Sequence, residues 1–112
     1  MSFPVRAVAP LLCALLTVPA QAGDLVTNGR VVRIANTGNN QAVFSIEVSG
    51  GTQNLCAGGW ITFPASAAAD AATHARAYAT ALLAFSTGAL VRVYNYQNNT
   101  CDTAAYLELA AP

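Results

Sequence analysis

The chain has 112 residues, of which 54% are hydrophobic and only 9% are charged, and its formal net charge at pH 7 is zero. This length is enough for a single domain. All five basic residues are arginines, and so weak a field gives no counterion-release drive toward nucleic acids or anionic membranes.

Residues 1–22 have the layout of a secretory signal peptide, with cleavage expected before Gly23. One early cation, Arg6, precedes an apolar run over residues 7–18, and small residues follow it. The run is too short to span a bilayer of about 30 Å as a helix, and Pro10 interrupts it. We therefore expect a secreted or periplasmic protein with no membrane segment after cleavage.

The mature chain, residues 23–112, forms one predicted domain and keeps two cysteines, Cys56 and Cys101, while Cys13 is removed with the leader. An even pair in an exported protein predicts a disulfide. The alternative is a metal site, but two cysteines and the single His74 do not make a zinc tetrad. We expect no metal and no cofactor.

Turn-forming residues and alternating apolar residues predict five strands in the mature chain. Residues 23–29 form a polar lead before the first strand, and residues 37–41 form the first turn. The expected strands cover residues 30–37, 42–49, 60–63, 89–96 and 104–110.

The alternation also assigns side chains to faces of these strands. Val32 and Ile34 share one face of the first strand, and Phe44, Ile46 and Val48 share one face of the second. We expect both faces to contribute to the core.

One helix is predicted between the third and fourth strands. Ser66 or Asp70 caps its N-terminus, and Gly88 ends it in the left-handed region. Ala77 and Ala84 are expected on its outer face. The apolar residues expected on its buried stripe recur at intervals of three and four: Ala71, Ala75, Tyr78, Leu82 and Phe85.

The order β-β-β-α-β-β predicts a mainly β protein with one helix and an OB-fold-like five-stranded barrel. Charge placement supports the hairpins of this barrel. Arg33 falls opposite Glu47 in the first hairpin, and Arg92 falls opposite Glu108 in the last.

No catalytic residues are expected, because the sequence shows no cysteine beside His74 and no paired carboxylates. Tyr94 and Tyr96 share one strand face with Arg92, whereas Asn95 points the other way. Aromatic rings beside small polar groups are typical of a sugar site. The alternative is that these tyrosines cover the barrel exterior or a subunit contact.

Three stretches, GRVVRI, AVFSIEV and YATALLAFSTGALVRVYNY, resemble the B subunits of the subtilase, pertussis-like and typhoid-type AB5 toxins. The resemblance implies an OB barrel, a ring-shaped homopentamer and binding of sialylated or related glycans. Matched to that family, Asn28, Glu47 and Tyr94 are candidate ligand-binding residues, and Tyr96 joins them through its strand face. The whole chain is also similar to a family of small, uncharacterised secreted bacterial proteins that share the spaced cysteine pair.

Two hypotheses follow. In the first, the protein is an exported, non-enzymatic binding module that recognises a glycan as an AB5 B subunit does. In the second, it is a secreted or periplasmic protein-interaction or inhibitor domain. Leu83 lies off the buried helix stripe, where a large apolar residue favours a subunit contact. Neither hypothesis includes a nucleic-acid partner.

Overall fold

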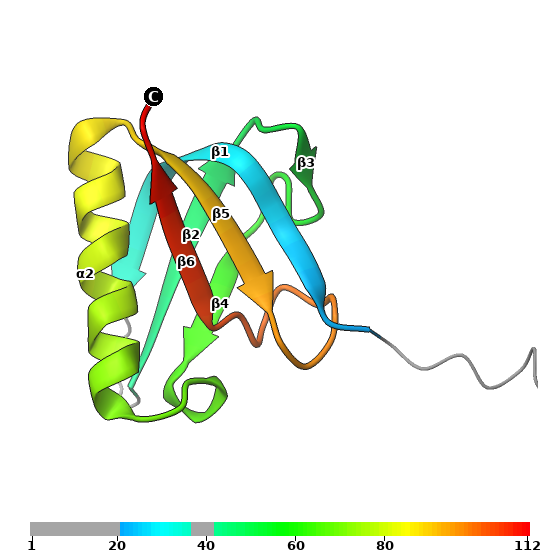
Figure 1. The fold of residues 1–112 in the computed structure, drawn as a ribbon, viewed down its shortest axis with the longest axis vertical. Coiled ribbons are helices and arrows are strands. Elements are labelled where there is room, and N and C mark those ends of the chain that lie inside the picture. Colours follow the sequence, from blue (N-terminus) through cyan, green and yellow to red (C-terminus); the bar gives the residue numbers. More distant parts are fainter. Residues whose placement is uncertain (1–20, 37–41) are drawn as a thin grey trace, which may run out of the picture.

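The computed structural model describes residues 21–36 and 42–112, which form a mainly β fold with one long helix (Figure 1). Residues 1–20 of the predicted leader and the predicted turn over residues 37–41 lie outside this description. In chain order the elements are β1 (Gly23–Asn36), β2 (Val43–Ser49), β3 (Gln53–Asn54), β4 (Ile61–Pro64), the short 3-10 helix η2 (Ala65–Ala67), α2 (Ala71–Thr87), β5 (Leu90–Asn95) and β6 (Tyr106–Ala110).

The strands form one antiparallel sheet in the order β4-β2-β1-β5-β6, and β3 pairs with β1 beside this path. β1 is central because its first half pairs with β5 and β3 and its second half pairs with β2. The predicted class and the order β-β-β-α-β-β are confirmed for the longer strands, and β3 is an addition.

The two ends of this open sheet approach each other. Thr62 of β4 donates its N–H to the carbonyl of Cys101 at 2.8 Å, and its own carbonyl accepts from the N–H of Ala104 at 3.0 Å. The segment before β6 therefore bridges to β4 without forming a full ladder. The sheet is open rather than a closed five-stranded barrel, so the OB-fold-like arrangement stays a prediction with which this bridge agrees.

The core lies between the sheet and α2. The predicted inward face of β2 is confirmed, because Phe44, Ile46 and Val48 are all buried. Phe44 stacks on Phe63 of β4 with ring centroids 4.6 Å apart. Stacked rings of this kind contribute beyond the area that they bury.

The predictions for β1 are partly wrong. The strand begins at Gly23, and the supposed polar lead contains two fully buried residues, Leu25 and Val26. Further along, Val31 is buried and Val32 is 42% exposed, the reverse of the predicted faces. The register of β1 shifts at three places along its pairing with β2 and β5. Each shift breaks the strict alternation on which the prediction depended.

β1 curves over the top of the sheet as Figure 1 is drawn, and Asn28 and Gly29 lie at one of these register shifts. Asn28 has a φ of 59°, in the left-handed region that asparagine tolerates. A Cβ on Gly29 would lie 2.4 Å from Cγ1 of Val48 and 2.8 Å from Cγ1 of Val26. Glycine is required here because the backbone packs directly against two core valines.

The predicted ends of α2 are confirmed, but its predicted buried stripe is wrong except at Tyr78, which packs against the core. Asp70 caps the N-terminus by accepting from the N–H of Thr73 at 2.7 Å, and Gly88 ends the helix with a φ of 72°. The fully buried helix residues are Ala81 and Ala84.

Small side chains bring α2 close to the sheet. Ala77 and Tyr78 pack against the same core, so Ala77 and Ala84 are inward rather than outward as predicted. Leu82 and Phe85, expected in the core, are 42% and 52% exposed. Leu82, Leu83 and Phe85 of α2 are therefore large apolar residues that the rest of the described chain leaves exposed.

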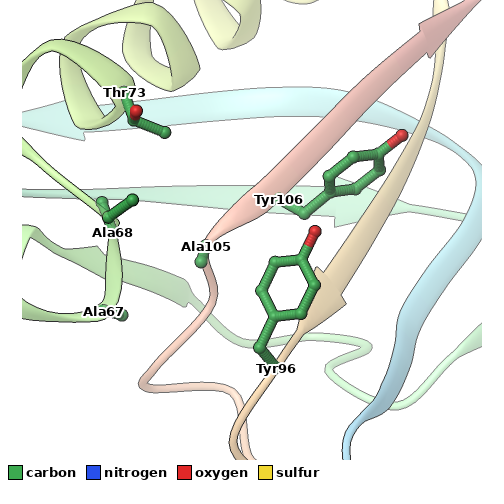
Figure 2. A pocket seen from close by; sticks show the side chains of 7 residues that line it. Ala67, Ala68, Thr73, Tyr96, Ala105 and Tyr106 are labelled. Atoms are coloured by element: carbon green, nitrogen blue, oxygen red, sulfur yellow. The ribbon is translucent and has the colours of Figure 1, made fainter.

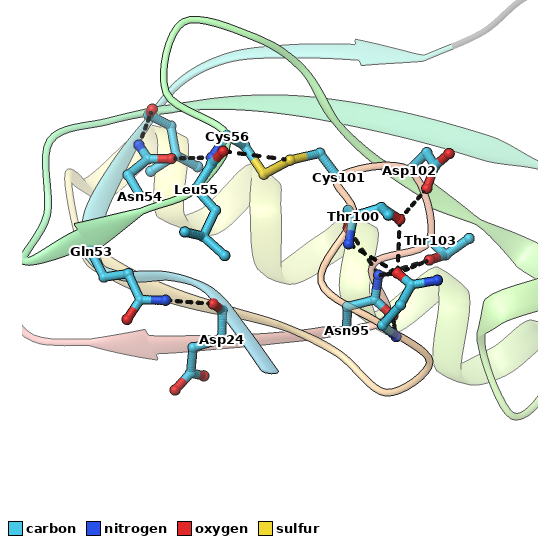
Figure 3. Close-up of a disulfide and its surroundings, with 12 residues drawn as sticks. Asp24, Gln53, Asn54, Leu55, Cys56, Asn95, Thr100, Cys101, Asp102 and Thr103 are labelled. Carbon is cyan, nitrogen blue, oxygen red and sulfur yellow. Dashed lines mark hydrogen bonds between the residues drawn. A yellow bond between two sulfur atoms is a disulfide. The ribbon is translucent and has the colours of Figure 1, made fainter. Parts of the chain in front are cut away.

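The predicted disulfide is present. Cys56 and Cys101 are joined by an S–S bond of 2.02 Å between Cα atoms 6.0 Å apart (Figure 3). The bond connects the turn after β3 to the loop between β5 and β6. Leu55 also donates its N–H to the carbonyl of Leu25 at 2.8 Å, which fastens the same turn to β1.

The double variant Cys56→Ser/Cys101→Ser is expected to unfold with a free energy about 4 kcal/mol below that of the oxidised protein. The reason is that the unfolded chain regains the freedom of a loop spanning 45 residues. Urea denaturation at neutral pH measures the difference. Reduced wild type is the matched control and should lose the same amount. An oxidised protein no more stable than the double variant would contradict the prediction.

Candidate functional site

Three tyrosines form an aromatic surface on the outer side of β5 and β6. Alternation along β5 puts Tyr94 and Tyr96 on one face, whereas Val93 and Asn95 on the other face are fully buried. The pairing of β5 with β6 places Tyr106 directly opposite Tyr94. Ring centroids lie 5.0 Å apart for Tyr94–Tyr96 and 6.4 Å apart for Tyr96–Tyr106, both edge to face. We call Tyr94, Tyr96 and Tyr106 the tyrosine cluster.

Arg92 lies at the base of the tyrosine cluster between two carboxylates. Its Nε donates to Oδ1 of Asp24 at 2.6 Å, and its Nη1 lies 3.4 Å from Oε1 of Glu108. The guanidinium carbon is 5.5 Å from the Tyr94 ring centroid and 5.6 Å from that of Tyr106. Asp24, Arg92 and Glu108 together therefore carry a net charge of −1.

These contacts also raise the pKa values of Arg92 and Tyr106. The hydrogen bond to Asp24 raises the pKa of Arg92, so the guanidinium stays charged at any physiological pH. The hydroxyl of Tyr106 donates to Oε1 of Glu108 at 3.0 Å. This hydrogen bond raises the pKa of Tyr106, and the charge of Glu108 adds to the effect. The phenol is therefore kept neutral as a hydrogen-bonding group.

Two hollows lie on either side of Tyr96 and Tyr106. The tyrosine hollow has a volume of about 290 Å³ and is lined by Arg92 and the tyrosine cluster. The alanine hollow, of about 440 Å³, separates the two rings from the chain between β4 and α2 (Figure 2). The other residues that line the alanine hollow are Ala67, Ala68, Ala69, Thr73 and Ala105.

A buried amide holds the loop that leads from β5 to β6. Asn95 donates through Nδ2 to the carbonyl of Thr100 at 2.9 Å and to Oγ1 of Thr103 at 2.7 Å. Its Oδ1 accepts from the N–H of Gln97 at 2.8 Å. The disulfide at Cys101 fixes the same loop (Figure 3). The tyrosine cluster is therefore built on a rigid base.

The structure brings only some of the predicted site residues together. Tyr94 and Tyr96 are in contact, as described above. Glu47 lies on β2, two strands away from β5, where Arg33 binds it at 3.1 Å. Asn28 is exposed on β1 at a register shift. The predicted ion pair of Arg33 with Glu47 is confirmed, and so is that of Arg92 with Glu108.

Tyr106 and Asp24 belong to the site although neither was predicted to do so, and Arg92 and Glu108 were predicted only as an ion pair. Tyr106 could have been found, because the register that puts Arg92 opposite Glu108 also puts Tyr94 opposite Tyr106. Asp24 could not, because it reaches Arg92 only through the pairing of β1 with β5, which the sequence does not predict.

The single histidine lies on α2 beside two aromatic residues of the core. His74 is half-buried on α2, and its Nε2 lies 2.7 Å from the carbonyl oxygen of Phe63. Its ring centroid is 5.3 Å from that of Phe44. Within residues 21–36 and 42–112, no three His, Cys, Asp or Glu residues are grouped so that they could hold a metal ion. In the same part of the chain, no helix has the length and hydrophobicity to cross a membrane.

A model of a family of unknown function (DUF5992) matches residues 6–111. The chain belongs to this family. The match covers nearly the whole sequence, which agrees with the predicted similarity to a family of uncharacterised proteins. No curated protein and no solved structure matches the chain significantly. The resemblance of this family member to AB5 toxin B subunits stays a prediction.

The variant Glu108→Gln is expected to lower the pKa of Tyr106 toward that of a free tyrosine. A neutral amide accepts a weaker hydrogen bond and removes the negative charge beside the phenol. An NMR pH titration of the tyrosine ring carbons measures the change. Glu47→Gln removes a different paired carboxylate and should leave Tyr106 unaffected. Equal Tyr106 pKa values in both variants would contradict the assignment.

Proposed function

We propose that the chain is an exported, non-enzymatic binding module whose tyrosine cluster binds a glycan. The observation that carries this proposal is the arrangement of three tyrosine rings around Arg92, beside two hollows and above a buried amide. Binding sites commonly combine apolar walls with a few well-placed polar groups.

The chemistry of the surface suits a sugar. The electron-rich faces of tyrosine rings pack on the C–H groups of a pyranose, and phenol, guanidinium and carboxylate groups hydrogen bond to its hydroxyls. Tyr96 is 61% exposed, and its hydroxyl has no hydrogen-bond partner among the described residues. The rigid base means that little ordering is needed on binding.

Export is part of the proposal. Residues 1–22 have the features of a secretory leader, and a disulfide between Cys56 and Cys101 is typical of an oxidising compartment. The resemblance to AB5 toxin B subunits points in the same direction, toward an exported glycan-binding protein. His74 is engaged with a core carbonyl, which leaves it a structural rather than a catalytic role.

Tyr96→Ala is expected to weaken glycan binding about thirtyfold, because truncating a central aromatic anchor costs about 2 kcal/mol. A glycan array of the oxidised, exported protein identifies ligands, and isothermal titration calorimetry then compares the variants. The matched control is Trp60→Ala, which removes another exposed aromatic ring that lies over Arg33. A blank array for the wild type, or equal affinities of wild type and Tyr96→Ala, would contradict the proposal.

A second function, protein–protein interaction, is favoured by the uncovered face of α2. Leu82, Leu83 and Phe85 are 42%, 53% and 52% exposed near its C-terminal end. Toward the N-terminal end the exposed residues include the small alanines Ala75 and Ala79, together with Arg76. We propose a second copy of the chain as the occupant, because an antiparallel pair of helices would place the bulky half of each over the small half of the other.

Leu83→Glu is expected to shift the protein from an oligomer to a monomer, because a charge at the centre of an apolar contact is not compensated. Native mass spectrometry counts the copies and separates a dimer from the pentamer that the toxin resemblance implies. Leu55→Glu is the matched control, since Leu55 is also 53% exposed but lies in the turn after β3. A monomeric wild type would contradict self-association and leave the face to a different protein.

A further inference from the structure

The binding surface is longer than one sugar ring. A third hollow, of about 270 Å³, lies between α2 and β6 and is lined in part by Arg76, Thr80 and Leu107. It shares Thr73, Ala105 and Tyr106 with the alanine hollow, which in turn shares Tyr96 and Tyr106 with the tyrosine hollow. The three hollows therefore meet at Tyr106, and a chain of sugar units could occupy them in succession.

The charge of the tyrosine hollow disfavours an acidic unit there. Its only cation, Arg92, is already bound to Asp24 and to Glu108, and both acids remain partly exposed. A ligand carboxylate would meet an excess of negative charge with no free cation to compensate for its desolvation. The hydroxyls of an uncharged sugar carry no such penalty.

The alanine hollow suits an acetamido group. Four methyl side chains form most of its lining, and they offer contact to an apolar substituent rather than to a hydroxyl. Figure 2 shows Ala67 and Ala68 on one side of the hollow and Tyr96 and Tyr106 on the other. Ala105 lies between them in this view, and Thr73 lies on the helix. The Thr73 hydroxyl can hydrogen bond to the amide of the same group.

We infer that the ligand is a linear oligosaccharide of uncharged, N-acetylated sugar units, with one acetyl methyl in the alanine hollow. This inference rests on the proposed glycan-binding function and names the class of glycan. Arg76 is the one place where an acidic unit could bind instead, because the guanidinium contacts only the Thr73 hydroxyl among the described residues.

Calorimetry with four probes tests the inference on the full, oxidised chain: chitotetraose, cellotetraose, the glucosamine tetramer and 3′-sialyllactose. Chitotetraose and cellotetraose share their backbone and differ in the acetamido group. Chitotetraose is expected to bind about tenfold more tightly, because a buried methyl group is typically worth that much discrimination. The glucosamine tetramer carries ammonium groups in place of the acetamido groups, so tighter binding of this probe than of chitotetraose would overturn the inference of an uncharged, N-acetylated ligand.

The variant Ala68→Val tests the contribution of the alanine hollow separately from that of the rest of the surface. The backbone of Ala68 is extended, with φ −88° and ψ 157°, so valine fits there and fills the hollow. The variant is expected to lose the preference for chitotetraose over cellotetraose. Ala111→Val, at an exposed position outside the strands, is the matched control and should keep the preference.

The outcomes distinguish this inference from the proposed function. If chitotetraose and cellotetraose bind equally and Tyr96→Ala weakens both, glycan binding stands and the acetamido inference is overturned. Tighter binding of 3′-sialyllactose, abolished by Arg76→Ala, would also overturn it in favour of an acidic glycan. If none of the four probes binds, the inference fails, and the glycan array decides separately on the proposed function.

Discussion

The pairing of β1 with three other strands is the constraint on which the rest of the structure depends. One strand serves both halves of the sheet only because it bends, and the bend requires Gly29 to lie against Val48 and Val26 with no Cβ between them. Any larger residue would push β1 away from β2 and open the core. The positive φ of Asn28 beside it is tolerated because the side chain is exposed and carries no β branch.

The same strand also assembles the candidate site. Its first residues place Asp24 opposite Tyr94, where the carboxylate holds the Arg92 guanidinium between two rings. Asn95 supports the surface from the core side, and the disulfide ties its loop to the turn after β3. Exposed aromatic residues are usually mobile, but here the side chains that support them, Asp24, Arg92 and Asn95, are held on β1 and β5. A preorganised surface of this kind favours binding because few side chains lose freedom.

How much could be predicted from the sequence depended on how regular each segment is. β2 alternates strictly, so the positions of Phe44 and Ile46 were predictable, and the helix ends followed from Asp70 and Gly88. The faces of β1 were not predictable, because register shifts arise from its pairing with distant strands. The buried side of α2 was not predictable either, because side-chain size is a poor guide to burial where a helix lies close to a sheet. Close approach to the sheet instead selected the alanines.

The bridge between β4 and the segment before β6 has a consequence for how the protein can assemble. A free edge strand offers unpaired amides that template strand addition and fibril growth. The backbone amide and carbonyl of Thr62 on β4 already make hydrogen bonds. β4 is also only four residues long and ends at Pro64. The other outer strand, β6, runs beside α2 (Figure 1). At the β4 edge, contacts between copies therefore depend on side chains rather than on strand addition, so a single substitution can abolish or redirect them.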